Sequence, residues 1–132
     1  MLHLRKRTKS PLPSLPFEKI KDFVLGQGYE LSLVFVSKKI SRELNQRYRG
    51  KDKPTNILSF PLSENEGEIL IDIAIVREEA KELGENEREY LAYIFIHGLA
   101  HLKGLDHGSK MEVEEKKIRS KFKDIFVSSN FI

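Results

Sequence analysis

Cysteine is absent from all 132 residues of the sequence. Its absence excludes disulfide bonds, zinc sites with thiolate ligands and cysteine nucleophiles, so no disulfide partner is expected. Any metal ion must then be bound by histidine and carboxylate side chains. A chain without disulfides is also compatible with a reducing compartment.

Long hydrophobic segments are missing too. The longest uninterrupted apolar run covers residues 91–96, whereas a membrane-spanning helix needs about 20 residues. The N-terminus is charged but has no apolar segment before its prolines, which argues against a signal peptide. We therefore expect a soluble, cytoplasmic protein with no membrane partner, folded as a single domain over residues 1–132.

Charge is unevenly distributed, although the net charge is only +3. Residues 38–53 carry seven basic and two acidic side chains, whereas residues 64–89 carry ten acidic and three basic ones. Four more basic side chains lie within residues 1–10. Such segregation is compatible with a polyanionic partner on one side of the molecule, or with two solvated faces of opposite charge.

Apolar periodicity and turn residues predict an α+β fold with about four strands and about five helices. The expected strands are a short one at Leu2 and Leu4, residues 30–36, residues 56–60 and residues 68–75. The expected helices are one capped by Ser14, one from Ser37 to Gly50, one over residues 77–83, one from Asn86 to about Lys103, and one capped by Ser109. We expect a mixed sheet packed against these helices, with the apolar 86–103 helix at the centre.

Three histidines lie within eleven residues, in the string HGLAHLKGLDH. His97 and His101 are four residues apart, so they share one face of a helix. Gly104 allows the chain to turn back and bring His107 to the same point. Three imidazoles with a fourth position open are typical of a catalytic zinc site, and we expect one Zn²⁺ per chain. Any one of these histidines taken alone could instead be a hydrogen-bonded core residue.

The residue after the first histidine decides against one obvious class of enzyme. The spacing His-x3-His-x5-His matches the metzincin proteases, in which a glutamate at this position is the general base. Here the position is Gly98, which cannot transfer protons. Peptide hydrolysis is therefore not expected, although the metal ligands are retained.

A basic segment supplies groups that could bind phosphate. Arg47, Arg49, Lys51 and Lys53 lie within seven residues, and the planar guanidinium of arginine matches phosphate oxygens in a bidentate way. Asp106, beside His107, could orient a ligand histidine or handle protons, or it could be a turn residue that caps its own backbone. A zinc site beside cationic groups suits phosphodiester chemistry.

Two segments resemble the signatures of the YbeY family. HGLAHLKGLDH is similar to the family pattern HGxLHLxGYDH, and residues 48–61, YRGKDKPTNILSFP, resemble a second family signature almost letter for letter. Three residues depart from the family pattern: Ile71 replaces a glycine before Asp72, Ala100 replaces a leucine and Leu105 replaces a tyrosine. The resemblance covers most of residues 30–122.

The resemblance implies a zinc-dependent endoribonuclease specific for single strands. It implies a role in rRNA processing, notably at the 3′ end of small-subunit rRNA, and in late ribosome quality control. Single-stranded RNA and the ribosome or its assembly factors are the implied partners. His97, His101 and His107 match the zinc ligands, and Arg49 matches an arginine that grips the scissile phosphate. Asp72 matches an aspartate within a strand.

Two alternatives remain open at this point. The first is a non-catalytic ribosome-assembly factor that contains a structural zinc and binds rRNA; it would need a fourth protein ligand. His3, the remaining histidine, is expected instead at an exposed strand edge. The second alternative is a zincin-type metallopeptidase whose carboxylate base comes from elsewhere in the fold.

Overall fold

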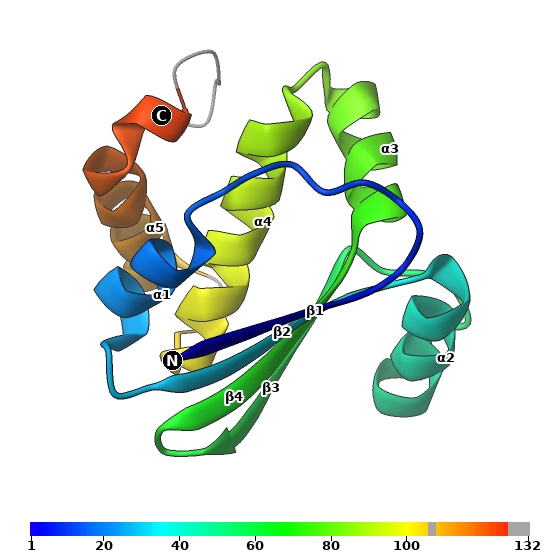
Figure 1. The fold of residues 1–132 in the computed structure, drawn as a ribbon, viewed down its shortest axis with the longest axis horizontal. Coiled ribbons are helices and arrows are strands. Elements are labelled where there is room, and N and C mark those ends of the chain that lie inside the picture. Colours follow the sequence, from blue (N-terminus) through cyan, green and yellow to red (C-terminus); the bar gives the residue numbers. More distant parts are fainter. Residues whose placement is uncertain (106–107, 127–132) are drawn as a thin grey trace.

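The computed structural model describes residues 1–105 and 108–126. Its elements are β1 (Leu2–Arg7), α1 (Phe17–Leu25), β2 (Glu30–Val36), α2 (Lys38–Arg49), β3 (Ile57–Ser63), β4 (Glu66–Asp72), α3 (Ile73–Leu83), α4 (Glu87–Leu102), α5 (Ser109–Lys121) and a short 3₁₀ helix, η1 (Lys123–Ile125). The predicted α+β class is confirmed, and Figure 1 shows one sheet with helices packed around it.

The four strands form one mixed sheet in the order β1-β2-β4-β3. β1, β2 and β4 are parallel, and β3 is antiparallel to β4. β1 and β3 are therefore the two edges. His3 lies on the β1 edge with 54 % of its side chain exposed, hydrogen-bonded to Glu30, as predicted.

Alternate residues of β3 face different helices because successive strand side chains point to opposite faces of a sheet. Phe60 packs on Tyr48 of α2, with ring centroids 4.9 Å apart. Its neighbour Ser59 donates a hydrogen bond of 3.4 Å to the carbonyl oxygen of Gly98 in α4. α2 and α4 therefore lie on opposite faces of the sheet, and Figure 1 shows α1, α3 and α5 grouped with α4.

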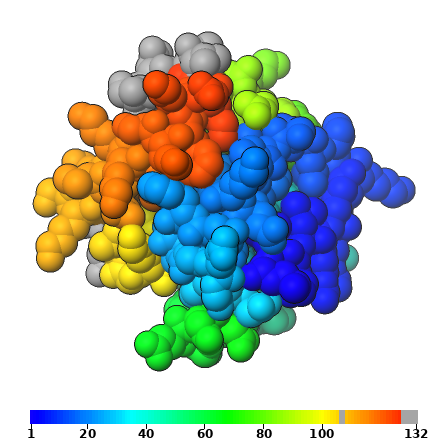
Figure 2. Space-filling view, turned by 60° about the vertical axis from the view of Figure 1, so that its left-hand side comes forward, coloured from blue at the N-terminus to red at the C-terminus, as the bar shows by residue number. Residues whose placement is uncertain are grey.

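α4 is the central helix, as its composition predicts. Ten of its 16 residues are buried, because it packs on β3 while α1, α3 and α5 contact its other sides. Figure 2 shows α1 and α5 side by side over this face, with the middle of α4 hidden beneath them. In the portion of the chain that the structure describes, no helix is long and apolar enough to cross a membrane.

The prediction of a strand over residues 68–75 is wrong at its C-terminal end. β4 ends at Asp72, and α3 begins at Ile73, four residues before the expected start of this helix. The Asp72 carboxylate accepts a hydrogen bond of 3.1 Å from the Ile75 backbone N–H. This N-cap switches the chain from strand to helix within a run of isoleucines whose alternation alone indicates a strand.

Two of the four predicted helix caps are confirmed, and one strand is longer than predicted. Ser37 and Asn86 cap α2 and α4 as expected. Ser14 and Ser109 do not cap their helices: α1 starts after Pro16 and α5 after Gly108, both without a side-chain cap. β3 also continues past Pro61 to Ser63, because a proline is tolerated on an edge strand.

Candidate active site

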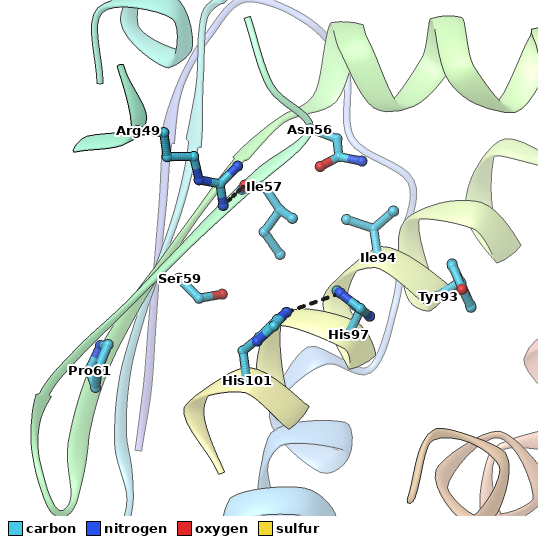
Figure 3. A pocket seen from close by; sticks show the side chains of 9 residues that line it. All are labelled: Arg49, Asn56, Ile57, Ser59, Pro61, Tyr93, Ile94, His97 and His101. Carbon is cyan, nitrogen blue, oxygen red and sulfur yellow. Dashed lines mark hydrogen bonds between the residues drawn. The ribbon is translucent and has the colours of Figure 1, made fainter. Parts of the chain in front are cut away.

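Two of the three predicted zinc ligands face each other on α4. The Nε2 atoms of His97 and His101 are 3.1 Å apart, and the rings meet edge to face with centroids 4.7 Å apart. Figure 3 shows the two imidazoles pointing toward one another, with Ile57 and Ser59 of β3 on the other side of the pocket. The helical spacing therefore places the two side chains together as expected, while their role as metal ligands stays a prediction.

The geometry of this pair fits a shared metal ion. Two nitrogens bound tetrahedrally at about 2.0–2.1 Å from zinc lie roughly 3.3 Å apart, close to the observed 3.1 Å. On its other side, the His97 Nδ1 atom lies 2.6 Å from the Glu115 carboxylate. Among the residues that the structure describes, no group of three or more possible ligands surrounds one point. The third predicted ligand, His107, and its neighbour Asp106 lie outside the described residues.

The histidine pair forms one wall of a pocket of about 490 Å³ between β3 and α4. This volume falls in the range of small-molecule sites. The β3 side contributes alternate residues of an edge strand, and α2 contributes Arg49 at the rim. The lining residues, drawn in Figure 3, are Arg49, Asn56, Ile57, Ser59, Pro61, Tyr93, Ile94, His97 and His101.

Arg49 is the predicted phosphate-binding residue that reaches this pocket. Its guanidinium donates hydrogen bonds of 3.4 Å to the Thr55 hydroxyl and to the Ile57 carbonyl oxygen. The chain reverses at Gly50, which has φ +71° in the left-handed region that favours glycine. Arg47, Lys51 and Lys53 are exposed, and none of them is among the residues that line the pocket.

Gly98 occupies the position of the metzincin glutamate, and packing explains its identity. A Cβ atom placed there would lie 2.5 Å from Ile57 Cδ1, 3.0 Å from Ser59 Oγ and 3.3 Å from Ile69 Cδ1. The absent side chain is what lets α4 approach β3 closely enough to form the pocket wall. A side chain at this position would therefore have to displace the side chains of Ile57 and Ser59.

Comparison with known proteins identifies the family. A family model described as "Endoribonuclease YbeY" matches residues 14–130. The chain belongs to this family. The endoribonuclease YbeY of Halalkalibacterium halodurans is 37% identical, with 95% of this chain and 88% of the relative covered. That of Halorhodospira halophila is 38% identical, with 70% of each chain covered. The solution structure of TM1509 from Thermotoga maritima matches with a TM-score of 0.65 and 28% identity, over 94% of this chain and 93% of that one.

The departure from the YbeY pattern at Ile71 lies in the core and not in the pocket. Ile71 is completely buried and pairs with Phe35 of β2 and Ile57 of β3. The neighbouring Asp72 is also buried, and it accepts a hydrogen bond of 2.7 Å from the Ser41 hydroxyl of α2 besides capping α3. Asp72 therefore joins β4, α2 and α3, and it does not line the pocket.

Sequence reasoning missed several polar residues at the pocket. Asn56 donates a hydrogen bond of 2.9 Å to Glu79, which also accepts one of 3.1 Å from the Tyr90 hydroxyl. Burial, reinforced by the charge of Glu79, raises the pKa of Tyr90, so this phenol stays protonated. Ser59 had a usable signal, because it is a polar residue on the core-facing side of an otherwise apolar strand. Asn56 lies within residues 48–61, which resemble a family signature, whereas Glu79 had no signal because it meets Asn56 only in the folded chain.

Proposed function

We propose that the pocket between β3 and α4 is the active site of a zinc-dependent endoribonuclease that cuts single-stranded rRNA. As a member of the YbeY family, the chain is an endoribonuclease, a hydrolase that acts on RNA. One observation carries the assignment of the site: the Arg49 guanidinium and the His97–His101 pair line the same pocket, although they come from different helices on opposite faces of the sheet.

His97, His101 and His107 would hold the metal ion. The donor set fits zinc because it consists of imidazoles, with the two described Nε2 atoms at a separation suited to a shared ion. Zinc, when bound, supplies a Lewis acid and acidifies a water molecule. Asp106, next to His107 in the sequence, is proposed to orient that ligand or to accept a proton.

Arg49 would bind and orient the scissile phosphate. Two of its five N–H groups donate to the protein within the described part of the chain, which leaves other donors of the fork for phosphate oxygens. A positioned guanidinium stabilises the charge that develops on a phosphodiester under attack. Arg47, Lys51 and Lys53, exposed around the same turn, would attract the flanking phosphates.

An aromatic surface beside Arg49 supports the preference for single strands. Tyr48 is 59% exposed and packs on Phe60, on the face of β3 opposite the histidines. Because β3 is an edge strand, an RNA strand can cross its open side and stack an unpaired base on Tyr48. Stacking of this kind needs a base that is not already within a duplex.

The alternatives receive no support. The relatives bear the name of an enzyme that cuts RNA, which does not favour a non-catalytic assembly factor. The same name does not favour a zincin-type peptidase, and packing at Gly98 disfavours a glutamate at the metzincin position. With rRNA as the substrate, we propose that the protein acts in the cytoplasm on the ribosome or its precursors.

The test uses the purified chain and an RNA fragment that carries the 3′ end of small-subunit rRNA. We expect cleavage of the single strand, much slower cleavage of the same fragment annealed to its complement, loss of activity on treatment with a chelator, and recovery with zinc. Equal cleavage of the duplex would contradict the single-strand preference. Activity that survives complete removal of metal would contradict the zinc-dependent mechanism.

A further inference from the structure

A buried carboxylate outside the pocket lies against one of the candidate ligands. Glu115 of α5 is 6% exposed, and its Oε1 atom lies 2.6 Å from His97 Nδ1. The two residues are 18 positions apart and belong to different helices. The contact is therefore made by tertiary packing of α5 on α4.

The chemistry of this contact determines where the imidazole carries its proton. An ionised carboxylate only accepts hydrogen bonds, so His97 Nδ1 must donate. In a neutral imidazole the Nε2 atom is then the one with the lone pair, and this is the atom that faces His101 and the pocket. With His97 in this tautomer, its Nε2 atom would accept the hydrogen bond from His101 Nε2.

We propose that Glu115 is a positioning residue that fixes His97 as the Nδ1–H tautomer, with its Nε2 lone pair aimed at the metal position. This inference deepens the proposed function and rests on it. A carboxylate in this place orients the ring and also raises the basicity of the ligand nitrogen.

Further contacts hold Glu115 itself in place. The Glu115 Oε2 atom lies 3.8 Å from the Nη1 atom of Arg119, one helical turn along α5. The Arg119 guanidinium lies over the Tyr93 ring, 5.7 Å from its centroid, and Tyr93 lines the pocket. The positive charge of Arg119 offsets the cost of burying the carboxylate. Through Glu115 and Arg119, α5 thus contacts His97 and Tyr93, two residues that line the pocket. α5 itself contributes no residue to the lining that the structure describes.

A merely structural role would have a different signature. If Glu115 served only to dock α5 on α4, its replacement would lower stability and leave the zinc affinity of the folded protein unchanged. Glu114, next to it on α5, provides the matched control, because it pairs with Lys103 Nζ at 2.7 Å near the surface and does not contact His97.

The experiment compares Glu115→Ala, Glu115→Gln and Glu114→Gln in the full chain. Zinc affinity is measured by competition with a chelator, and folding by thermal denaturation. We expect Glu115→Ala to weaken zinc binding about 10- to 100-fold. Glu115→Gln, whose amide oxygen still accepts from Nδ1 but carries no charge to raise the basicity of Nε2, should also weaken zinc binding, by less than Glu115→Ala does. Glu114→Gln should bind like the wild type.

A second readout does not depend on zinc or on activity. The ¹⁵N shifts of His97 in the zinc-free protein should report the Nδ1–H tautomer in the wild type and in Glu114→Gln, and a shift toward the Nε2–H form in Glu115→Ala. If Glu115→Ala does not fold, the zinc affinity of the isosteric Glu115→Gln decides the question. Wild-type zinc affinity in a folded Glu115→Gln, or an unchanged tautomer in Glu115→Ala, would overturn the proposal.

The outcome also separates this inference from the proposed function. If the wild type binds zinc and His101→Ala does not, the metal site stands whatever the Glu115 variants show. If the wild type binds no zinc at the histidines, the proposed function fails, while the tautomer measurement still tests the contact between Glu115 and His97.

Discussion

The α4 wall of the pocket and its Arg49 rim are built in different ways. On the α4 wall, His97 has 21% of its side chain exposed and is held by a short contact with a buried carboxylate. On the α2 side, Arg49 is exposed and is held by two 3.4 Å hydrogen bonds. A partner that orients a ligand histidine favours metal binding, whereas an exposed guanidinium on a long side chain can adjust to a flexible polyanion. We therefore expect that the proposed metal binding and the proposed phosphate binding can be disrupted separately.

Loss of a proposed metal ligand should have the largest effect on activity. His101→Ala should abolish stoichiometric zinc binding and lower the rate of RNA cleavage by roughly 1,000-fold or more, because metal catalysis contributes several kcal/mol to the transition state. Metal content and single-turnover rates test this. His3→Ala, at the exposed edge of β1, is the control and should match the wild type. Full activity in His101→Ala would contradict the proposed metal site.

A side chain at Gly98 should disrupt the approach of α4 to β3. Gly98→Glu would place a carboxylate against Ile57 and Ser59, and we expect it to lower the free energy of unfolding by about 3 kcal/mol or more, through overpacking and burial of a charge. Urea denaturation measures the change. Gly28→Glu is the control, because nothing lies within 4 Å of a Cβ atom there, and it should change stability by less than about 0.5 kcal/mol.

Loss of the guanidinium should impair catalysis and leave metal binding intact. Arg49→Ala should lower kcat/KM for a single-stranded RNA about 100-fold, the effect of removing one group that stabilises transition-state charge. Arg49→Lys should recover only part of this, because lysine lacks the planar fork. Arg5→Ala, on the opposite edge strand, serves as the charge-matched control. Loss of zinc from Arg49→Ala would show that the Arg49 rim and the histidines of α4 are not independent.

Removal of the exposed aromatic ring should have the smallest effect. Tyr48→Ala should raise KM for single-stranded RNA about ten-fold with little change in kcat, because stacking of one base contributes about 1–3 kcal/mol. Tyr48→Phe retains the ring and should behave like the wild type. Steady-state kinetics of the two variants provide the test. Equal KM values for Tyr48→Ala and the wild type would exclude the stacking surface.

Features fixed by local spacing could be predicted from the sequence. The His97–His101 pair follows from helical periodicity, and the end of α2 follows from Gly50. The end of β4 could not be predicted, because the alternating isoleucines of residues 69–75 indicate a strand and the decisive contact is the single hydrogen bond from Ile75 N–H to Asp72.

Contacts between distant elements account for what the sequence did not reveal. Glu115 meets His97 only because α5 packs on α4, and Asn56 meets Glu79 only because β3 begins beside α3. Glycine at position 98 is also explained by tertiary packing, because a side chain there would meet Ile57 and Ser59 of β3. The predictions for Asp106 and His107 concern residues outside the described part of the chain, and they remain predictions.

The most direct test of this active site is a crystal structure of the protein with zinc and a non-cleavable single-stranded RNA, with anomalous data collected at the zinc edge. We predict one zinc peak bonded to the Nε2 atoms of His97 and His101 and to His107, with a backbone phosphate against the Arg49 guanidinium. A zinc peak away from this pair, or an RNA phosphate bound far from Arg49, would contradict it.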